Sequence, residues 1–207
     1  MNPLRKQDEI ILASKSPRRQ YLLRKAGLDI TVTPSRIDEQ RLETESARAY
    51  VRRLATSKAE DVARRFPQAW VIGADTIVSI HGAIMGKPEG REDAREMLQR
   101  LSGETHQVYT GYCICNHSNH RLVNDVVVTE VTFKELSAAE IEWYIHTSEP
   151  FDKAGAYAIQ GLGTFLVRRI HGSYTNVVGL PVCEVIEILI HEGAIHLETN
   201  HTERSLA

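Results

Sequence analysis

Short apolar runs alternate along the chain with longer stretches in which apolar residues recur every three or four positions. The run over 9–13 is short and apolar, which predicts a buried strand. Ser16 suits the N-cap of the helix that follows, Pro17 suits its first position, and Gly27 suits its end. The clearest helical spacing covers 46–66. This regular change of period predicts alternating strands and helices.

The second half of the chain contains the longest predicted strands. Two of them flank the polar turn NHSNH and form a central hairpin. Beyond the hairpin, Ser137 and Glu140 form a capping box for a further helix, and a glycine-rich stretch follows. The predicted strands cover 9–13, 29–35, 69–74, 76–80, 83–85, 106–115, 122–133 and 165–170. The predicted helices cover 17–26, 46–66, 91–101, 137–146 and 181–191.

This order of elements predicts an α/β fold built on a mixed sheet. No internal repeat, low-complexity tract or linker divides the sequence, so we expect one domain over 1–207. The polar tail, about residues 197–207, is expected to fray.

Composition narrows the class of protein. Hydrophobic residues make up 42% of the 207 residues, enough for a globular core. The formal net charge is −2, with acids and bases well mixed, so no excess charge attracts nucleic acid or an anionic membrane. No apolar stretch approaches the roughly 20 residues that span a bilayer, and the start MNPLRKQDEI lacks a signal-peptide core. With only three cysteines, we expect a soluble cytoplasmic protein.

The stretch ILASKSPRRQ, residues 11–20, runs from a strand into a doubly cationic helix start. A helix start carries unpaired backbone N–H groups and a partial positive charge. Ser14, Ser16, Arg18 and Arg19 add hydrogen-bond donors and two full charges there, which is typical of a phosphate site. The alternative is that the two arginines are solvated first-turn residues. Cations at a helix N-terminus are mildly unfavourable, so an anion site is the better explanation.

Lys58 lies on the apolar side of its predicted helix, between Leu54 and Val62. A lysine at such a position either extends outward along the surface or points into a polar cleft. Both interpretations remain open on the pattern alone.

Asp75 interrupts the otherwise apolar VIGADTIV, between two predicted strands. A carboxylate there is costly unless it is paired or bound to a metal. It either forms a turn or acts as a metal ligand or general base at a strand end. Three further charged residues accompany glycines or a proline that permit close backbone approach: Lys87, Asp152 and Lys153.

A helix start rich in donors, several lysines and isolated acids are the parts that phosphoryl transfer requires. The sequence contains no P-loop motif and no G-x-S-x-G nucleophile elbow. The segments LASKSPRRQYLL, GADTIV, GKP, DKAGAYAIQGLG and IHGSYTNVVGLP, in this order, resemble the Maf family across nearly the whole chain.

The resemblance implies a nucleoside triphosphate pyrophosphatase, also called a septum-formation inhibitor. The implied fold is similar to that of the inosine triphosphatases: an elongated mixed sheet flanked by helices, with two lobes around a cleft. The implied reaction cuts between the α- and β-phosphates and leaves a nucleoside monophosphate and pyrophosphate. Family members need a divalent metal, Mg²⁺ or Mn²⁺, and commonly form homodimers.

The branch that prefers dTTP and UTP is indicated by three positions that match those with which the family sets base preference: Arg19, Thr76 and Gln160. A glutamine amide offers a donor and an acceptor, which suits the edge of thymine or uracil. We therefore expect pyrimidine triphosphates, including modified forms, as substrates, and a housekeeping role in the nucleotide pool. A preference for 7-methyl-GTP, found in another branch, is the alternative.

The same matching assigns Asp75 as the proton acceptor for the attacking water, and as a contact of the metal. It assigns Glu39 and Asp152 to the metal, with Asp38 as a substitute for Glu39. The residues implied to hold the triphosphate are Ser14, Arg18, Arg19, Lys58, Lys87 and Lys153.

Two alternatives of a different kind remain. The chain could be a nucleotide-binding regulator of septation without turnover; the carboxylate beside the phosphate cations favours the enzyme. Cys113, Cys115, His117 and His120 are zinc-type ligands in a short span. Their spacing fits no usual zinc finger, and the family resemblance implies no zinc.

Overall fold

The computed structural model describes residues 4–6, 8–42 and 45–197. Its centre is a seven-stranded mixed sheet with the order β3-β2-β4-β6-β7-β8, and β5 pairs with β4 outside this path. β2 pairs in parallel with both β3 and β4, and the remaining pairs are antiparallel. The strands of this sheet are β2 (Ile10–Leu12), β3 (Thr31–Val32), β4 (Trp70–Ile80), β5 (Ala83–Met85), β6 (Thr105–Asn116), β7 (Arg121–Phe133) and β8 (Val167–His171). The predicted α/β fold with a mixed sheet is confirmed.

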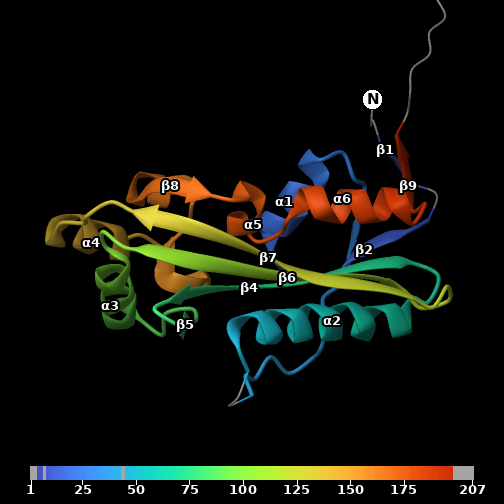
Figure 1. Cartoon of the computed structure of the whole chain (residues 1–207), viewed down its shortest axis with the longest axis horizontal. Coiled ribbons are helices and arrows are strands. Elements are labelled where there is room, and N and C mark those ends of the chain that lie inside the picture. Colours follow the sequence, from blue (N-terminus) through green and yellow to red (C-terminus); the bar gives the residue numbers. More distant parts are fainter. Residues whose placement is uncertain (1–3, 7, 43–44, 198–207) are drawn as a thin grey trace, which may run out of the picture.

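Helices cover both faces of the sheet. Figure 1 shows α2 along one face and α1, α5 and α6 on the other, with α3 and α4 beyond the end of the sheet that β5 occupies. The helices are α1 (Pro17–Lys25), α2 (Ala47–Arg65), α3 (Arg91–Leu101), α4 (Ala138–Ile145), α5 (Tyr174–Val178) and α6 (Val182–His191). Three 3₁₀ turns lie in the glycine-rich region: η1 (Pro150–Asp152), η2 (Ala154–Ala156) and η3 (Gly161–Leu166).

The alternation of side chains along β4 divides the core. Trp70, Ile72 and Ala74 belong to the larger cluster, which packs against α1, α3, α4 and α6. Val71, one position along, belongs to a smaller cluster with Ala55 and Ala59 of α2. Because successive residues of a strand face opposite sides, Asp75 points toward α2 and Thr76 points toward α1.

Two predictions of local structure were wrong. β4 is one strand from Trp70 to Ile80, not two strands separated at Asp75, because β6 pairs with it without interruption from Val71 to Ser79. Asp75 therefore lies within the strand, neither in a turn nor at a strand end. α3 begins at Arg91, as predicted, and Lys87 lies four residues before it.

The chain ends differ from the prediction in part. β1 (Leu4–Lys6) and β9 (Ile195–Leu197) form a separate antiparallel pair, so the beginning of the tail is a strand. The rest of the tail lies outside the described residues. The expectation of one domain in two lobes stays a prediction. No helix in the described part of the chain is both long and apolar enough to cross a membrane.

The zinc-type residues do not converge. Cys113 and Cys115 lie in the buried cluster beneath α2, whereas His117 and His120 lie exposed in the turn between β6 and β7. Among the residues that the structure describes, no three His, Cys, Asp or Glu side chains are placed to hold a metal ion by themselves.

Candidate active site

An open stretch of strand edge creates the candidate site. The pairing of β2 with β4 ends at Ile72, and that of β5 with β4 begins at Val78. Between these points no strand of the described residues covers this edge of β4, and a cavity of about 660 Å³ lies beside it. Its wall includes Asp75 and Thr76 from the strand, the start of α1, the 34–39 segment, Lys58 of α2, Lys87, the 152–154 segment and the end of α5. Segments distant in the sequence thus meet at one point.

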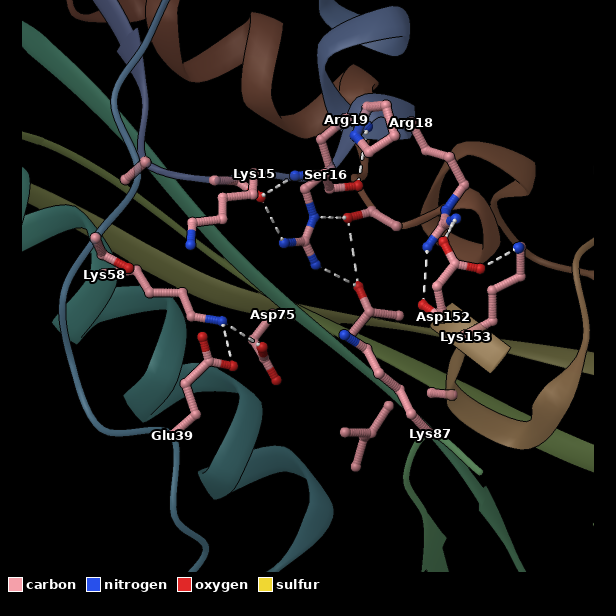
Figure 2. A pocket seen from close by; sticks show the side chains of 18 of the residues that line it. Lys15, Ser16, Arg18, Arg19, Glu39, Lys58, Asp75, Lys87, Asp152 and Lys153 are labelled. Carbon is pink, nitrogen blue, oxygen red and sulfur yellow. Dashed lines mark hydrogen bonds and ion pairs between the residues drawn. The ribbon is translucent and has the colours of Figure 1, made fainter. Parts of the chain in front are cut away.

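A cluster of three charges occupies one side of the cavity. The Nζ atom of Lys58 lies 2.7 Å from Oδ1 of Asp75 and 3.0 Å from Oε2 of Glu39. Lys58 and Asp75 are buried, while Glu39 is exposed. Figure 2 shows the lysine amine pointing between the two carboxylates. Of the two interpretations of Lys58, the structure has the lysine that points into the cleft.

Two glycines allow α2 to pack close enough to the sheet for Lys58 to contact Asp75. A Cβ atom on Gly73 would lie 2.2 Å from the carbonyl oxygen of Ala55, and one on Gly111 would lie 2.3 Å from that of Val51. Both glycines lie on the sheet face that α2 covers, and Gly111 is paired directly with Asp75. Since any side chain there would collide with helix backbone, the glycines set how closely α2 approaches the sheet.

The start of α1 forms the opposite wall. The Ser16 side chain accepts a hydrogen bond from the Arg19 backbone N–H and so caps the helix, as predicted. Ser14 Oγ accepts hydrogen bonds from the Ser16 backbone N–H at 3.1 Å and from Nη1 of Arg19 at 3.2 Å. Among the described residues no acceptor takes the Ser14 proton. Ser14 is therefore a hydroxyl that lines the cavity with its proton available.

The Arg19 guanidinium is buried in the protein rather than extended into the cavity. It donates from Nε to the Gly179 carbonyl at 2.7 Å, from Nη1 to the Ala74 carbonyl at 2.9 Å, and from Nη2 to Thr76 Oγ1 at 3.0 Å. Burial lowers the pKa of Arg19, and the charge of Asp75 offsets part of this effect. A guanidinium stays protonated even so.

Arg18 joins α1 to the glycine-rich region. Its Nη1 donates to Oδ2 of Asp152 at 2.9 Å, and Lys153 contacts the other oxygen of the same carboxylate. Burial raises the pKa of Asp152, but hydrogen bonds from Lys153 and Arg18 outweigh this and hold the pKa below its ordinary value. Asp152 thus stays ionised, and Arg18 and Lys153 already bind it. It is not one of the carboxylates that contact Lys58, which are Glu39 and Asp75.

Lys15 and Lys87 are cations that have no partner in the described part of the chain. Both are exposed, line the cavity, and have no ion pair or hydrogen bond among the described residues. Figure 2 shows both amines on the cavity side of the site. Lys87 was predicted from the sequence and Lys15 was not, although the position of Lys15 between Ser14 and Ser16 was a usable signal. Tyr50 was missed as well: it lines the cavity and donates from its hydroxyl to the Glu39 carbonyl at 2.9 Å.

Most of the predicted site residues surround this one cavity. They are Ser14, Arg18, Arg19, Glu39, Lys58, Asp75, Thr76, Lys87, Asp152 and Lys153. Gln160 is the exception: it immediately precedes η3 and does not belong to the cavity wall. Asp38, the substitute proposed for Glu39, is also outside the wall; its carboxylate accepts from the Gln40 backbone N–H.

The charges of the cavity suit a polyphosphate. Lys15, Lys58, Lys87, Lys153 and Arg18 bring five cationic groups, and three carboxylates face them. The α1 N-terminus adds its partial positive charge to the same space. An anion with several charges would be bound by cations from separate elements at once. A single carboxylate, Asp75, lies where the open strand edge meets these cations.

The chain is similar in sequence to curated proteins over nearly its whole length. A dTTP/UTP pyrophosphatase from Syntrophus aciditrophicus (strain SB) is 47% identical over 197 residues, which cover 95% of this chain and 96% of that protein. A dTTP/UTP pyrophosphatase from Geotalea uraniireducens (strain Rf4) is 50% identical over 189 residues, covering 91% and 97%.

Solved structures show likeness in fold. The Staphylococcus aureus Ham1 protein superimposes with a TM-score of 0.52 and 14% identity over 89% of this chain and 99% of that one. At this identity the likeness concerns the fold alone, and it agrees with the inosine triphosphatase-like architecture expected from the sequence. A family model described as Maf-like protein matches residues 9–192. With most of its length matched by that model and with relatives near 50% identity, the chain belongs to the Maf family.

Proposed function

We propose that this chain hydrolyses dTTP and UTP to the nucleoside monophosphate and pyrophosphate. The observation that carries the proposal is one buried carboxylate, Asp75, at the open edge of β4 in a cavity lined by cations from several elements. The curated relatives described above, which cover over nine-tenths of the chain, are named for this activity. Modified pyrimidine triphosphates and a housekeeping role in the nucleotide pool belong to the same proposal.

Asp75 acts as the proton acceptor. Its Oδ1 is bound by Lys58, whereas Oδ2 accepts no hydrogen bond from the described residues and is available to a water molecule. The water oxygen attacks the α-phosphorus, its proton passes to Asp75, and the bond from that phosphorus to the bridging oxygen breaks. Pyrophosphate leaves with the electron pair. Lys58 stabilises the ionised carboxylate that this role requires.

The cations hold the triphosphate and offset the charge of the leaving pyrophosphate. Lys15 and Lys87, which have no partner to release among the described residues, bind its oxygens directly. Ser14 donates its free proton. Arg18 and Lys153 bind the same anion while they keep their ion pairs with Asp152. Arg19 contributes through the groups that it holds rather than by its own charge.

The carboxylates fit a divalent cation in part. Mg²⁺ is commonly bound through one or two carboxylates together with substrate phosphates and water. Glu39 and Asp75 lie close together because both contact the Lys58 amine, and these two carboxylates would hold Mg²⁺ or Mn²⁺. Asp152 is occupied by Arg18 and Lys153, which makes it the weaker ligand. The metal would neutralise phosphate charge. Homodimer formation and a cytoplasmic location stay predictions.

Base preference depends on three positions, of which two lie at the cavity. Arg19 and Thr76 lie at the cavity, but their side chains are bonded to each other and to the protein. Gln160 lies outside the wall. We therefore expect the three positions to influence the base through the shape of the site, and a substrate panel is the measurement that decides.

The test is incubation with Mg²⁺ and a panel of triphosphates that includes dTTP, UTP, the purine triphosphates and 7-methyl-GTP. Pyrophosphate and orthophosphate are measured separately. Pyrophosphate from dTTP and UTP supports the proposal; orthophosphate alone, or product from 7-methyl-GTP only, contradicts it. Tight binding without product would indicate a regulator.

The role of Asp75 has its own test in the same assay. Asp75→Asn keeps the shape of the side chain but removes its basicity, so turnover should fall by a factor of at least roughly 10² while UTP still binds. Asp125→Asn, an exposed carboxylate on β7, serves as the matched control and should leave turnover unchanged. Near-normal turnover of the Asp75 variant would remove it from the role of base.

A further inference from the structure

A buried threonine outside the cavity is connected to the site through one hydrogen-bonded partner. Thr110 lies on β6, directly opposite Thr76 on β4, and is fully buried. It does not belong to the cavity wall. Its Oγ1 lies 2.9 Å from Oγ1 of Thr76, and it donates to the Asn176 carbonyl at 3.0 Å. Polar groups are seldom buried without hydrogen-bond partners, and these two bonds satisfy the Thr110 hydroxyl within the core.

These contacts give the hydrogen bonds a direction. A hydroxyl has one proton, and Thr110 gives its proton to the Asn176 carbonyl. Thr76 then donates to Thr110 at 2.9 Å and shares this proton with the Gly179 carbonyl at 3.3 Å, and the lone pairs of Thr76 accept from Nη2 of Arg19. The result is a chain of three donations, from Arg19 to Thr76, from Thr76 to Thr110 and from Thr110 to Asn176. Each bond polarises the next in such a chain.

The far end of the chain is fixed to the sheet. Nδ2 of Asn176 donates to the Val108 carbonyl at 3.1 Å and to Thr129 Oγ1 at 2.9 Å. These bonds fasten the short α5 helix to β6 and β7. The backbone carbonyl of Asn176 is thereby a fixed acceptor. It orients the Thr110 hydroxyl, and through Thr76 this orientation affects Arg19.

The near end of the chain reaches two groups of the site. Nη1 of Arg19 donates to the carbonyl of Ala74, the residue immediately before Asp75, and also to Ser14 Oγ. The first bond fixes the peptide that carries the proposed base. The second, together with the Ser16 N–H, fills both lone pairs of Ser14, so that its proton can only be donated elsewhere. With the Gly179 bond, four of the five N–H groups of Arg19 are in use.

We propose that Thr110 is a positioning residue for the reaction: through Thr76 it holds Arg19 in the orientation that aims Asp75 and Ser14 at the substrate. This inference rests on the proposed pyrophosphatase function. It also explains how Arg19 and Thr76 influence catalysis while their hydrogen bonds are directed into the protein.

The experiment compares Thr110→Val with Thr110→Ser. Valine has nearly the shape of threonine and suits a strand, but it lacks the hydroxyl; serine keeps the hydroxyl. For pyrophosphate release from UTP, we expect kcat of T110V to fall at least about tenfold, the factor that one lost hydrogen bond typically brings. KM should change less than threefold, because the cations that bind the triphosphate are untouched. T110S should stay within about threefold of wild type in kcat.

A matched control separates this effect from a general loss of a hydroxyl. Thr105 on β6 forms the same kind of pair with Thr132, at 2.9 Å, but in an exposed position away from the cavity. Thr105→Val should leave both kcat and KM unchanged. Affinity for the non-cleavable α,β-methylene UTP should remain close to that of wild type in T110V.

Each outcome has a consequence. If wild type releases no pyrophosphate, the proposed function is wrong and this inference falls with it. If wild type is active and T110V matches T105V in kcat, Thr110 does not position the site. If T110S is as impaired as T110V, the effect is structural and the inference is overturned. Thr110→Ala is the second variant without a hydroxyl. If neither Thr110→Val nor Thr110→Ala folds, Thr110 has a structural role and the inference is overturned.

Discussion

Lys87 is the residue at which the phosphate-binding part of the proposal is tested most directly. It is exposed, lines the cavity and has no partner among the described residues, so its removal does not disturb the fold. Lys87→Gln should lower kcat/KM for UTP about tenfold or more, because one charge-assisted hydrogen bond to phosphate is worth about 1.5–3 kcal/mol. The measurement is steady-state pyrophosphate release at fixed Mg²⁺.

Lys25→Gln provides the control for this prediction. Lys25 is an exposed lysine at the end of α1, outside the cavity wall, and its amine lies over the Tyr21 ring. It should leave kcat/KM unchanged. Equal effects of both variants would mean that Lys87 acts through the overall charge of the protein rather than on the bound phosphate.

At the scale of single residues, site residues could be predicted from the sequence where a charged side chain interrupted an apolar pattern. Lys58 on an apolar helix side and Asp75 in an apolar strand are costly without partners, and the structure shows them 2.7 Å apart. Arg19 gave the same signal at a helix start, but its contacts could not be read: whether an arginine points outward or inward depends on carbonyls 55 and 160 residues away.

At the scale of elements, the approach of α2 to the sheet decides where Lys58 lies. Gly111→Ala would place a Cβ atom 2.3 Å from the Val51 carbonyl oxygen, so α2 must move outward. We expect the variant to lose about 2 kcal/mol or more of unfolding free energy, in the range of overpacked cores. Activity should fall as well, measured at a temperature where the variant is still folded, because Lys58 moves with the helix away from Asp75.

A glycine without neighbours gives the comparison. Gly90, at the N-cap of α3, has an extended backbone, and a Cβ atom added there would meet no other atom of the described residues within 4 Å. Gly90→Ala should change the unfolding free energy by less than about 1 kcal/mol and leave activity intact. If Gly111→Ala were equally harmless, the close approach of α2 would have no part in the site.

Elements with a strong period were predicted closely, and those defined by pairing were not. The bounds of α2 and α3 agree with the prediction, as does the hairpin of β6 and β7. β4 was divided wrongly because a polar residue in an apolar run is typical of a turn, whereas continuous pairing with β6 outweighs that local preference. The short α5 was missed, since five residues provide too little pattern.

At the scale of the whole molecule, the order of the strands could not be derived from composition and periodicity. β2 lies between β3 and β4 although β3 follows it in the chain, and β8 occupies the far edge beside β7. These pairings depend on long-range packing. The family resemblance, carried by five short segments, supplied the architecture instead, and the family is confirmed by its relatives.

The buried histidine His106 links the long strands to the glycine-rich region. Its Nε2 lies 2.8 Å from the Tyr157 hydroxyl, and its ring packs edge-on against Phe133 and Tyr157. Burial lowers the pKa of His106 to about 4 from its usual 6.5. The folded protein therefore keeps this ring neutral over a range of pH in which the unfolded chain takes up a proton.

The stability of the whole molecule should follow this difference in protonation. Between pH 6.5 and 4 the unfolded chain binds more protons at this position, so the free energy of unfolding decreases as pH falls, by up to about 3 kcal/mol from His106 alone. Urea unfolding at pH 7.5, 6.5, 5.5 and 4.5 measures the slope. His106→Gln retains a partner for the Tyr157 hydroxyl but cannot be protonated, so its slope should be shallower. His117→Gln in the exposed turn should keep the slope of wild type. Parallel slopes for wild type and His106→Gln would show that the acid sensitivity arises elsewhere, because a neutral amide cannot reproduce the proton uptake of a histidine.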